Sequence, residues 1–263
     1  MENNGIEDIN IYNEKMRRSV LDKMFFIDKI PENTIIVDWG CADGSLLKEV
    51  IKFFPNDNYI GYDIDNKMVE LCKKNIPNIN VTSDINQLKN WLINKYKGKK
   101  VTINLSSILH ELYSYRNADE IDKFWQLVFD VADIVVIRDM IFHHSMDRPS
   151  FHDDVKKVRK NENRRYVMDF EAVHGTIENN KNLIHYLLKY KYKNEGSRDN
   201  WEREVKENYL PLSREKLDMI IPNNFKIRYE HSFVLPYIQR QVENDFGIII
   251  KDNTHLKLIL EKV

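Results

Sequence analysis

Cysteine and long apolar runs are scarce in this chain, and each scarcity excludes a class of protein. The 263 residues include two cysteines, Cys41 and Cys72, whose spacing is typical of neither a disulfide framework nor a zinc site. No apolar run approaches the length that crosses a bilayer, and the first residues lack the basic and apolar segments of a signal peptide. We therefore expect a cytoplasmic protein, in a reducing compartment, with no membrane partner.

The chain also has little net charge. Its 40 lysines and arginines are balanced by 41 aspartates and glutamates, so bulk charge gives no reason to expect tight nonspecific binding of nucleic acid. With 42% hydrophobic residues, a chain of this length can bury one sizeable core. We expect a single domain over residues 1–263.

Three of the eight glycines fall between residues 40 and 61. Gly40 and Gly44 lie between a β-branched run at 34–38, typical of a buried parallel strand, and residues 45–51, whose apolar spacing is helical. Glycine at such a turn lets the backbone bend sharply or approach a ligand, and the free N–H groups of the following helix suit a bound polar group. This pattern predicts a nucleotide-cofactor site.

A second expected strand, at residues 58–63, ends in Asp63. This acid comes 23 positions after Gly40, the separation at which doubly wound folds place a carboxylate on a ribose diol. Asp63 is therefore our candidate for binding a ribose.

Residues 38–44, Asp-Trp-Gly-Cys-Ala-Asp-Gly, resemble the first motif of the class I S-adenosylmethionine (SAM)-dependent methyltransferases, acid-x-Gly-x-Gly-x-Gly, with alanine in place of the middle glycine. Asp63 matches the family's second motif, residues 81–85 resemble its third, and residues 101–107 resemble its fourth strand with the start of the catalytic rim. The resemblance covers residues 31–140 well and the last part of the chain more loosely. It implies SAM as the cofactor, bound by Asp38, Gly40, Cys41, Ala42, Gly44, Asp63, Ile64, Asp84, Ile85, Leu105 and Ser106.

NAD-dependent oxidoreductases also bind their cofactor at a glycine turn, and they are the competing interpretation. They favour Gly-x-Gly-x-x-Gly directly after the strand, whereas here Asp38 precedes the glycines and their spacing differs. In the methyltransferases that this chain resembles, the acid lies near the methionine end of the cofactor. The resemblance therefore favours SAM over NAD.

Alternating strand and helix patterns predict an α/β fold, a doubly wound and mostly parallel sheet of about seven strands. The expected strands are 34–38, 58–63, 79–82, 100–105 and 133–138, and the expected helices between them are 45–53, 66–75, 85–96 and 117–130. Four parts follow one another: an N-terminal helical cap at 1–30, a SAM-binding core at 31–140, a helical insertion or lid at 141–209, and a final helix with an antiparallel β-hairpin at 210–263. The cap is expected as one amphipathic helix over 11–30.

The segment after the fourth strand is rich in polar and phenolic side chains, and it is expected to line the substrate mouth. Methyl transfer to a protonated nucleophile needs a base, and His110 and Glu111 are the candidates. Tyr113 and Tyr115 are expected to shape the substrate wall, although ordinary packing would explain them equally well. The alternatives are a hydrogen bond from His110 to a loop carbonyl, and a helix cap or an arginine pair for Glu111.

Arg138 and Asp139 follow the fifth expected strand and are further candidates for substrate binding. A salt bridge that closes the end of the sheet is the alternative. The nearby run of possible metal ligands has no recognised ligand spacing, so we predict no metal site there. Its members are His143, His144, Asp147, His152, Asp153 and Asp154.

The acceptor is the least constrained part of the prediction. Residues 104–107 depart from the Asn/Asp-Pro-Pro-aromatic motif that holds an exocyclic nitrogen in related enzymes, and no cysteine stands at the rim to attack a pyrimidine. We expect methyl transfer to an O or N nucleophile of a small molecule or of RNA. Residues 151–206 contain both cations and aromatics, a mixture that suits RNA binding. The same residues include 13 lysines and arginines but also 10 acids, so an ordinary solvated surface is the alternative. A noncatalytic module that binds RNA or a protein through the same fold is the other alternative.

Overall fold

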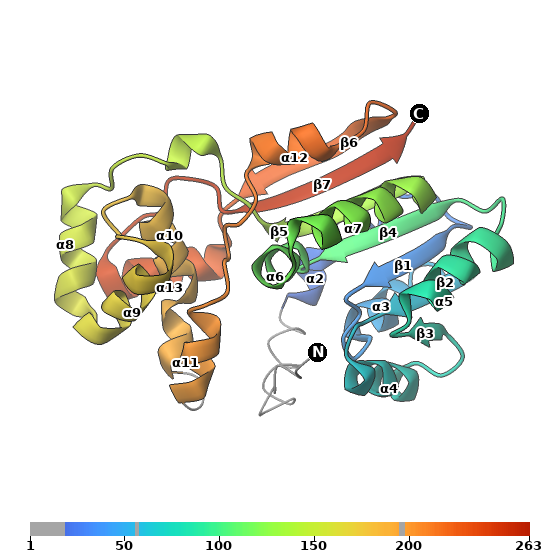
Figure 1. Cartoon of the computed structure of the whole chain (residues 1–263), viewed down its shortest axis with the longest axis horizontal. Coiled ribbons are helices and arrows are strands. Elements are labelled where there is room, and N and C mark those ends of the chain that lie inside the picture. Colours follow the sequence, from blue (N-terminus) through green and yellow to red (C-terminus); the bar gives the residue numbers. More distant parts are fainter. Residues whose placement is uncertain (1–18, 56–57, 195–197) are drawn as a thin grey trace.

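The computed structural model describes residues 19–55, 58–194 and 198–263, and its centre is one seven-stranded sheet in the order β3-β2-β1-β4-β5-β7-β6 (Figure 1). The first five strands pair in parallel, and β7 runs antiparallel to both of its neighbours. This confirms the predicted doubly wound sheet with two antiparallel C-terminal strands. The strands are β1 Ile35–Trp39, β2 Asn58–Tyr62, β3 Asn80–Thr82, β4 Val101–Ser106, β5 Ile134–Met140, β6 Phe225–Phe233 and β7 His255–Lys262.

Helices cover both faces of the sheet, which explains why its strands are apolar at successive positions. In β1, Val37 and Trp39 pack on one layer, whereas Ile36 packs on the other. The first layer contains α5 Ile85–Asn90 with its π-helical extension Trp91–Lys95, α6 Leu109–Tyr115, α7 Ala118–Val131 and α12 Arg214–Ile220; the second contains α2 Val20–Lys23, α3 Ser45–Val50 and α4 Asn66–Asn75.

Side-chain caps fix where several of these helices begin. The Asp65 carboxylate accepts a hydrogen bond from the backbone N–H of Lys67 at the start of α4, and Asp84 does the same at the start of α5. Asn117 and Glu120 form a capping box at the start of α7. The strand ends that carry the candidate site are therefore followed at once by rigid helices.

The expected N-terminal helix over 11–30 is wrong in its described part. Residues 11–18 lie outside the described residues, and α2 ends at Lys23. The chain then forms tight turns, in which Ile27 N–H donates to the Met24 carbonyl and Lys29 N–H to the Phe26 carbonyl. These turns bury Phe26 completely against the layer that contains α3, so tertiary packing overrides the helical pattern here.

The helical insertion after β5 is present, and it forms a core of its own beside the sheet. Its helices are α8 His152–Asn161, α9 Arg164–His174, α10 Asn180–Lys189 and α11 Arg198–Glu204. A helix that the sequence patterns did not predict, α13 Pro236–Phe246, connects β6 to β7 and packs into the same core, where Figure 1 shows it among α8 to α11. The two last strands pair as predicted, but a helical excursion rather than a tight turn joins them.

None of the helices in the described ranges combines the length and the apolar character needed to cross a membrane.

Candidate functional site

The loop between β1 and α3 adopts a backbone that few residue types tolerate. Gly40, Ala42 and Gly44 all have positive φ, at 81°, 46° and 79°. The N–H groups of Gly40 and Cys41 donate to the Tyr62 carbonyl at 2.7 and 3.0 Å, which ties the loop to the end of β2. The predicted glycine turn is therefore held at the carboxyl ends of two neighbouring parallel strands, where open α/β sheets bind ligands.

Gly44 is also required by packing. A Cβ at this position would lie 2.6 Å from Cys72 Sγ and 3.0 Å from Ile76 Cδ1, both on the adjacent α4 segment. The Gly40 position is less crowded, since its Cβ would lie 3.1 Å from Ile108 Cδ1. The loop is thus pressed between α4 and the segment that follows β4.

Asp63 joins the end of β2 to the glycine loop. Its Oδ2 accepts a hydrogen bond from the Ala42 N–H at 2.9 Å, and its Oδ1 accepts one from the Asp65 N–H at 2.9 Å. Burial raises the pKa of the Asp63 carboxyl, and the two N–H donors oppose that shift. Each carboxylate oxygen can accept a further bond, so Asp63 can shape the loop and still receive ribose hydroxyls.

A small pocket opens between α2 and this loop, and it carries both signs of charge. Asp38 is buried at the end of β1, where it accepts a hydrogen bond from Asn104 Nδ2 at 2.7 Å. Burial raises the pKa of Asp38 to about 6. Lys23 reaches the same pocket from α2, and burial lowers its pKa to about 8, against the attraction of Asp38 and other acids. The lining residues are Val20, Lys23, Asp38, Gly40, Cys41, Ala42, Asp43, Ser45, Leu46 and Ser106.

The pocket is nearly closed by α2. Its cavity volume is about 20 Å³, little more than one water molecule needs. Arg138 holds α2 in place, because its Nε donates to Asp22 Oδ2 at 2.7 Å and Lys257 Nζ lies 2.5 Å from the other oxygen of Asp22. Among the described residues this pocket is too small for a nucleotide-sized ligand, so we expect α2, which contributes Val20 and Lys23 to its lining, to move when one binds.

Three further predicted cofactor residues follow the ends of β2 and β3. Ile64 is 51% exposed, Asp84 is exposed at the start of α5, and Ile85 is half-buried against the core. Ser106 faces the pocket, and its hydroxyl donates to Asn104 Oδ1 at 2.8 Å. The Leu105 side chain is fully buried in the core, so a contact of Leu105 with the cofactor would have to come from its backbone.

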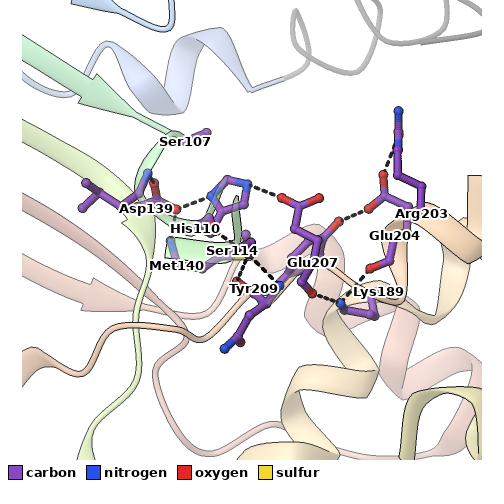
Figure 2. A network of polar contacts seen from close by, with 12 residues as sticks. Ser107, His110, Ser114, Asp139, Met140, Lys189, Arg203, Glu204, Glu207 and Tyr209 are labelled. Carbon is purple, nitrogen blue, oxygen red and sulfur yellow. Dashed lines mark hydrogen bonds and ion pairs between the residues drawn. The ribbon is translucent and has the colours of Figure 1, made fainter. Parts of the chain in front are cut away.

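His110 lies at the centre of a polar cluster on the other side of the rim (Figure 2). Its Nδ1 is 2.7 Å from Asp139 Oδ1, and its Nε2 is 3.3 Å from Glu207 Oε1. Asp139 is fixed in turn by the N–H groups of Leu109 and Met140, each at 2.7 Å. One ring nitrogen of His110 is thus held by a rigid carboxylate, and the other faces a carboxylate from the insertion.

The charges of this cluster shift one another's proton affinities. Burial alone would lower the pKa of His110, but Asp139, Glu207 and Glu111 raise it to about 9. Burial raises the pKa of Glu207 to about 7. The surrounding protein also raises the pKa of Glu111, whose side chain stays exposed to solvent. His110, Glu111 and Glu207 each place one potential metal-ligand atom within 4.8 Å of those of the other two.

Glu207 was not among the residues expected from the sequence. It lies in the segment after α11, and buried side chains of the insertion hold the backbone of that segment. Lys189 Nζ donates to the carbonyls of Glu204 and Glu207 (Figure 2). His185 Nε2 accepts a hydrogen bond from the Tyr209 N–H at 3.0 Å. No local pattern could have shown that this segment meets α6.

The four predicted substrate-binding residues do not gather at one place. Tyr115 is 45% exposed, and burial together with Glu207 and Glu204 raises its pKa to about 12. Tyr113 points to α7 instead, where its hydroxyl accepts from Trp125 Nε1 at 3.0 Å. The Arg138 guanidinium is paired with Asp22, as the salt-bridge alternative expected, and Asp139 positions His110.

The run from His143 to Asp154 does not converge on one point. His144 Nε2 lies 3.0 Å from Ser213 Oγ, and Asp147 accepts from Asn179 Nδ2. Within the part of the chain that the structure describes, His110, Glu111 and Glu207 are the one group of three such side chains close enough to share an ion.

The cation and aromatic run at 189–193 turns largely inward. Lys189 and Tyr190 are buried, Lys191 Nζ lies 2.5 Å from Asp245, and Lys193 is paired with Glu162. Because its side chains are buried or paired with acids in this way, the run is poorly suited to binding RNA.

Comparison with solved structures shows which proteins share this fold. A SAM-dependent methyltransferase from Anabaena variabilis matches with a TM-score of 0.53 and 13% identity, over 94% of this chain and 85% of its own. One from Archaeoglobus fulgidus matches with a TM-score of 0.51 and 17% identity, over 97% of this chain and 100% of its own. The plantazolicin methyltransferase BamL, crystallised with a triazolic desmethylPZN analog and SAH, matches with a TM-score of 0.50 and 13% identity, over 95% of this chain and 87% of its own.

Comparison of the sequence with protein-family models gives no match, and comparison with curated protein sequences gives none either. The likeness therefore lies in the three-dimensional arrangement. The fold of this chain is that of the class I SAM-dependent methyltransferases.

Proposed function

We propose that this protein is a SAM-dependent methyltransferase that acts on an O or N nucleophile of a small molecule or of RNA. One observation carries the proposal: a pocket with a buried ammonium and a buried carboxylate, Lys23 and Asp38, adjoins a glycine loop that is capped by Asp63. These groups, in this order along the rim, suit a cofactor with a zwitterionic amino-acid end and a ribose. The sheet topology supports the proposal, because the pocket lies at the carboxyl ends of its parallel strands.

In this proposal each end of the cofactor has its own residues. Lys23 pairs with the carboxylate of the methionine part, Asp38 attracts its positive charges, and Asp63 accepts hydrogen bonds from the ribose. Asp84 and Ile85 border the adenine. The bound sulfonium supplies an activated methyl group, so the protein has to position the acceptor and lower the proton affinity of its nucleophile.

The acceptor lies, in our proposal, against the cluster around His110 and Glu111. Glu111 is the exposed carboxylate of that cluster, and His110 is buried behind it. Residues 31–140, together with Lys23, then hold the cofactor, and residues 141–209 cover the acceptor and bring Glu207 to the rim. Cys41 and Cys72 are buried free thiols, and in our proposal the protein works in a reducing compartment such as the cytoplasm.

The test combines binding with turnover. Calorimetric titration should show binding of SAM and of S-adenosylhomocysteine but not of NAD, and labelled methyl should pass from SAM into a fraction of cell extract. Glu111→Gln should bind SAM as the wild type does and lose most transfer, whereas Glu243→Gln, on the exposed face of α13, should change neither. Binding of NAD without SAM would favour the oxidoreductase alternative, and binding of SAM without any transfer would favour a noncatalytic module.

A further inference from the structure

Three potential metal ligands meet where the sheet and the insertion touch. His110 and Glu111 come from the start of α6, and Glu207 comes from the segment after α11. His110 and Glu207 are buried, whereas Glu111 is open to solvent and provides a way in. This is a cluster of one imidazole and two carboxylates built from two separate parts of the chain.

The separation of the two buried groups fits ligands of one ion. Cation bonds of about 2.0 to 2.2 Å, at angles between octahedral and tetrahedral, place two ligand atoms roughly 3.0 to 3.5 Å apart. His110 Nε2 and Glu207 Oε1 are 3.3 Å apart. A direct charge-assisted hydrogen bond would be shorter, typically about 2.7 to 2.9 Å.

Asp139 prepares His110 for such a role. A histidine that binds a metal through one ring nitrogen usually donates its other N–H to a carboxylate, which fixes the tautomer and the ring orientation. Asp139 Oδ1 is 2.7 Å from His110 Nδ1, and two backbone N–H groups hold Asp139 in place (Figure 2). His110 Nε2 then faces Glu207 Oε1, and either a proton on Nε2 or a bound cation can lie between the two atoms.

We propose that His110 Nε2 and the carboxylates of Glu111 and Glu207 bind one divalent cation of the Mn²⁺ to Zn²⁺ group, with open positions on its exposed side. Mixed imidazole and carboxylate ligands suit these ions. The next step rests on the proposed methyltransferase function: the open positions coordinate a hydroxyl of the acceptor and lower its pKa, so that its proton leaves to solvent before the methyl group is transferred. The acceptor class is therefore one with an oxygen nucleophile, best with a second oxygen beside it that can chelate the same ion.

The test measures the ion directly, on the full chain and without SAM. Electron paramagnetic resonance of Mn²⁺ should show one bound ion per chain in the wild type. Glu207→Gln keeps the shape of the side chain and should weaken Mn²⁺ binding by about tenfold or more. Asp139→Asn removes the carboxylate that supports His110 and should weaken Mn²⁺ binding by roughly 10- to 100-fold. Glu111→Gln should also weaken it, and since Glu111 is exposed, this variant keeps the proposal testable if a buried variant fails to fold.

Asp153→Asn is the matched control, because this exposed acid on α8 belongs to the other run of possible ligands. It should leave Mn²⁺ binding unchanged. Absence of binding at millimolar Mn²⁺ would overturn the proposal, and so would binding that Glu111→Gln and Glu207→Gln leave intact. A parallel SAM titration separates the two claims: Mn²⁺ binding without SAM binding would refute the methyltransferase alone, and SAM binding without Mn²⁺ binding would refute the metal site alone.

Discussion

Replacing Gly44 by alanine should destabilise the protein through two separable effects. The backbone at Gly44 has a φ of 79°, and holding an L-residue there costs about 1 to 2 kcal/mol. The new Cβ would also lie 2.6 Å from Cys72 Sγ and 3.0 Å from Ile76 Cδ1, and overpacking of this kind costs about 1 to 3 kcal/mol. The expected loss in the free energy of unfolding is therefore about 2 to 5 kcal/mol.

Gly98 provides the matched control. Its φ is 82°, nearly that of Gly44, but a Cβ there meets no atom within 4 Å. Gly98→Ala should therefore lose only the backbone part, about 1 to 2 kcal/mol. Urea unfolding of both variants gives the difference, and adding Cys72→Ala to Gly44→Ala should recover part of the packing loss. Equal losses for Gly44→Ala and Gly98→Ala, with no coupling to Cys72, would refute the claim that the loop is pressed against α4.

Three further predictions concern the cofactor pocket. SAM affinity should be highest between about pH 6 and 8, because Asp38 loses its charge below its pKa of about 6 and Lys23 loses its charge above its pKa of about 8. In a pH profile of SAM affinity, Asp38→Asn should abolish the fall on the acid side and Lys23→Met the fall on the alkaline side. A fall that persists in its variant would contradict the assignment. Asp22→Asn removes the partner that holds Arg138 against α2, so stopped-flow binding should show faster SAM entry, and an unchanged rate would mean that α2 does not limit access. Asp63→Ala should weaken SAM by about 1 to 3 kcal/mol through lost charge-assisted hydrogen bonds, measured by calorimetry, and unchanged affinity would remove Asp63 from the ribose site.

Local sequence patterns predicted the sheet because its signals are local. The β-branched run at 34–38 became β1, and the predicted helix 66–75 has the bounds of α4, whose cap Asp65 lies beside it in the sequence. The helix α13 was missed because no element was assigned between the two expected strands of the C-terminal hairpin, although Ile238, Val242 and Phe246 repeat there at helical spacing. Its apolar face is buried only against the insertion, a partner that local patterns do not show.

The candidate site divides in the same way. Asp38 lies near the end of β1, Asp63 directly follows β2 and His110 comes shortly after β4, so their place at the rim could be predicted from the order of elements. Lys23 and Glu207 reach the rim only through tertiary contacts, Lys23 by the docking of α2 and Glu207 by the contacts of Lys189. Neighbouring residues of β4 differ in the same way, since the Leu105 side chain is buried in the core whereas Ser106 faces the pocket.

The central claim is that the pocket between α2 and the glycine loop receives SAM, and a crystal structure of the protein grown with S-adenosylhomocysteine tests it most directly. We predict that α2 is displaced, with the carboxylate of the compound beside Lys23 and its ribose hydroxyls beside Asp63. A structure in which the compound is absent or bound elsewhere, with Lys23 and Val20 still closing the pocket, would contradict the account.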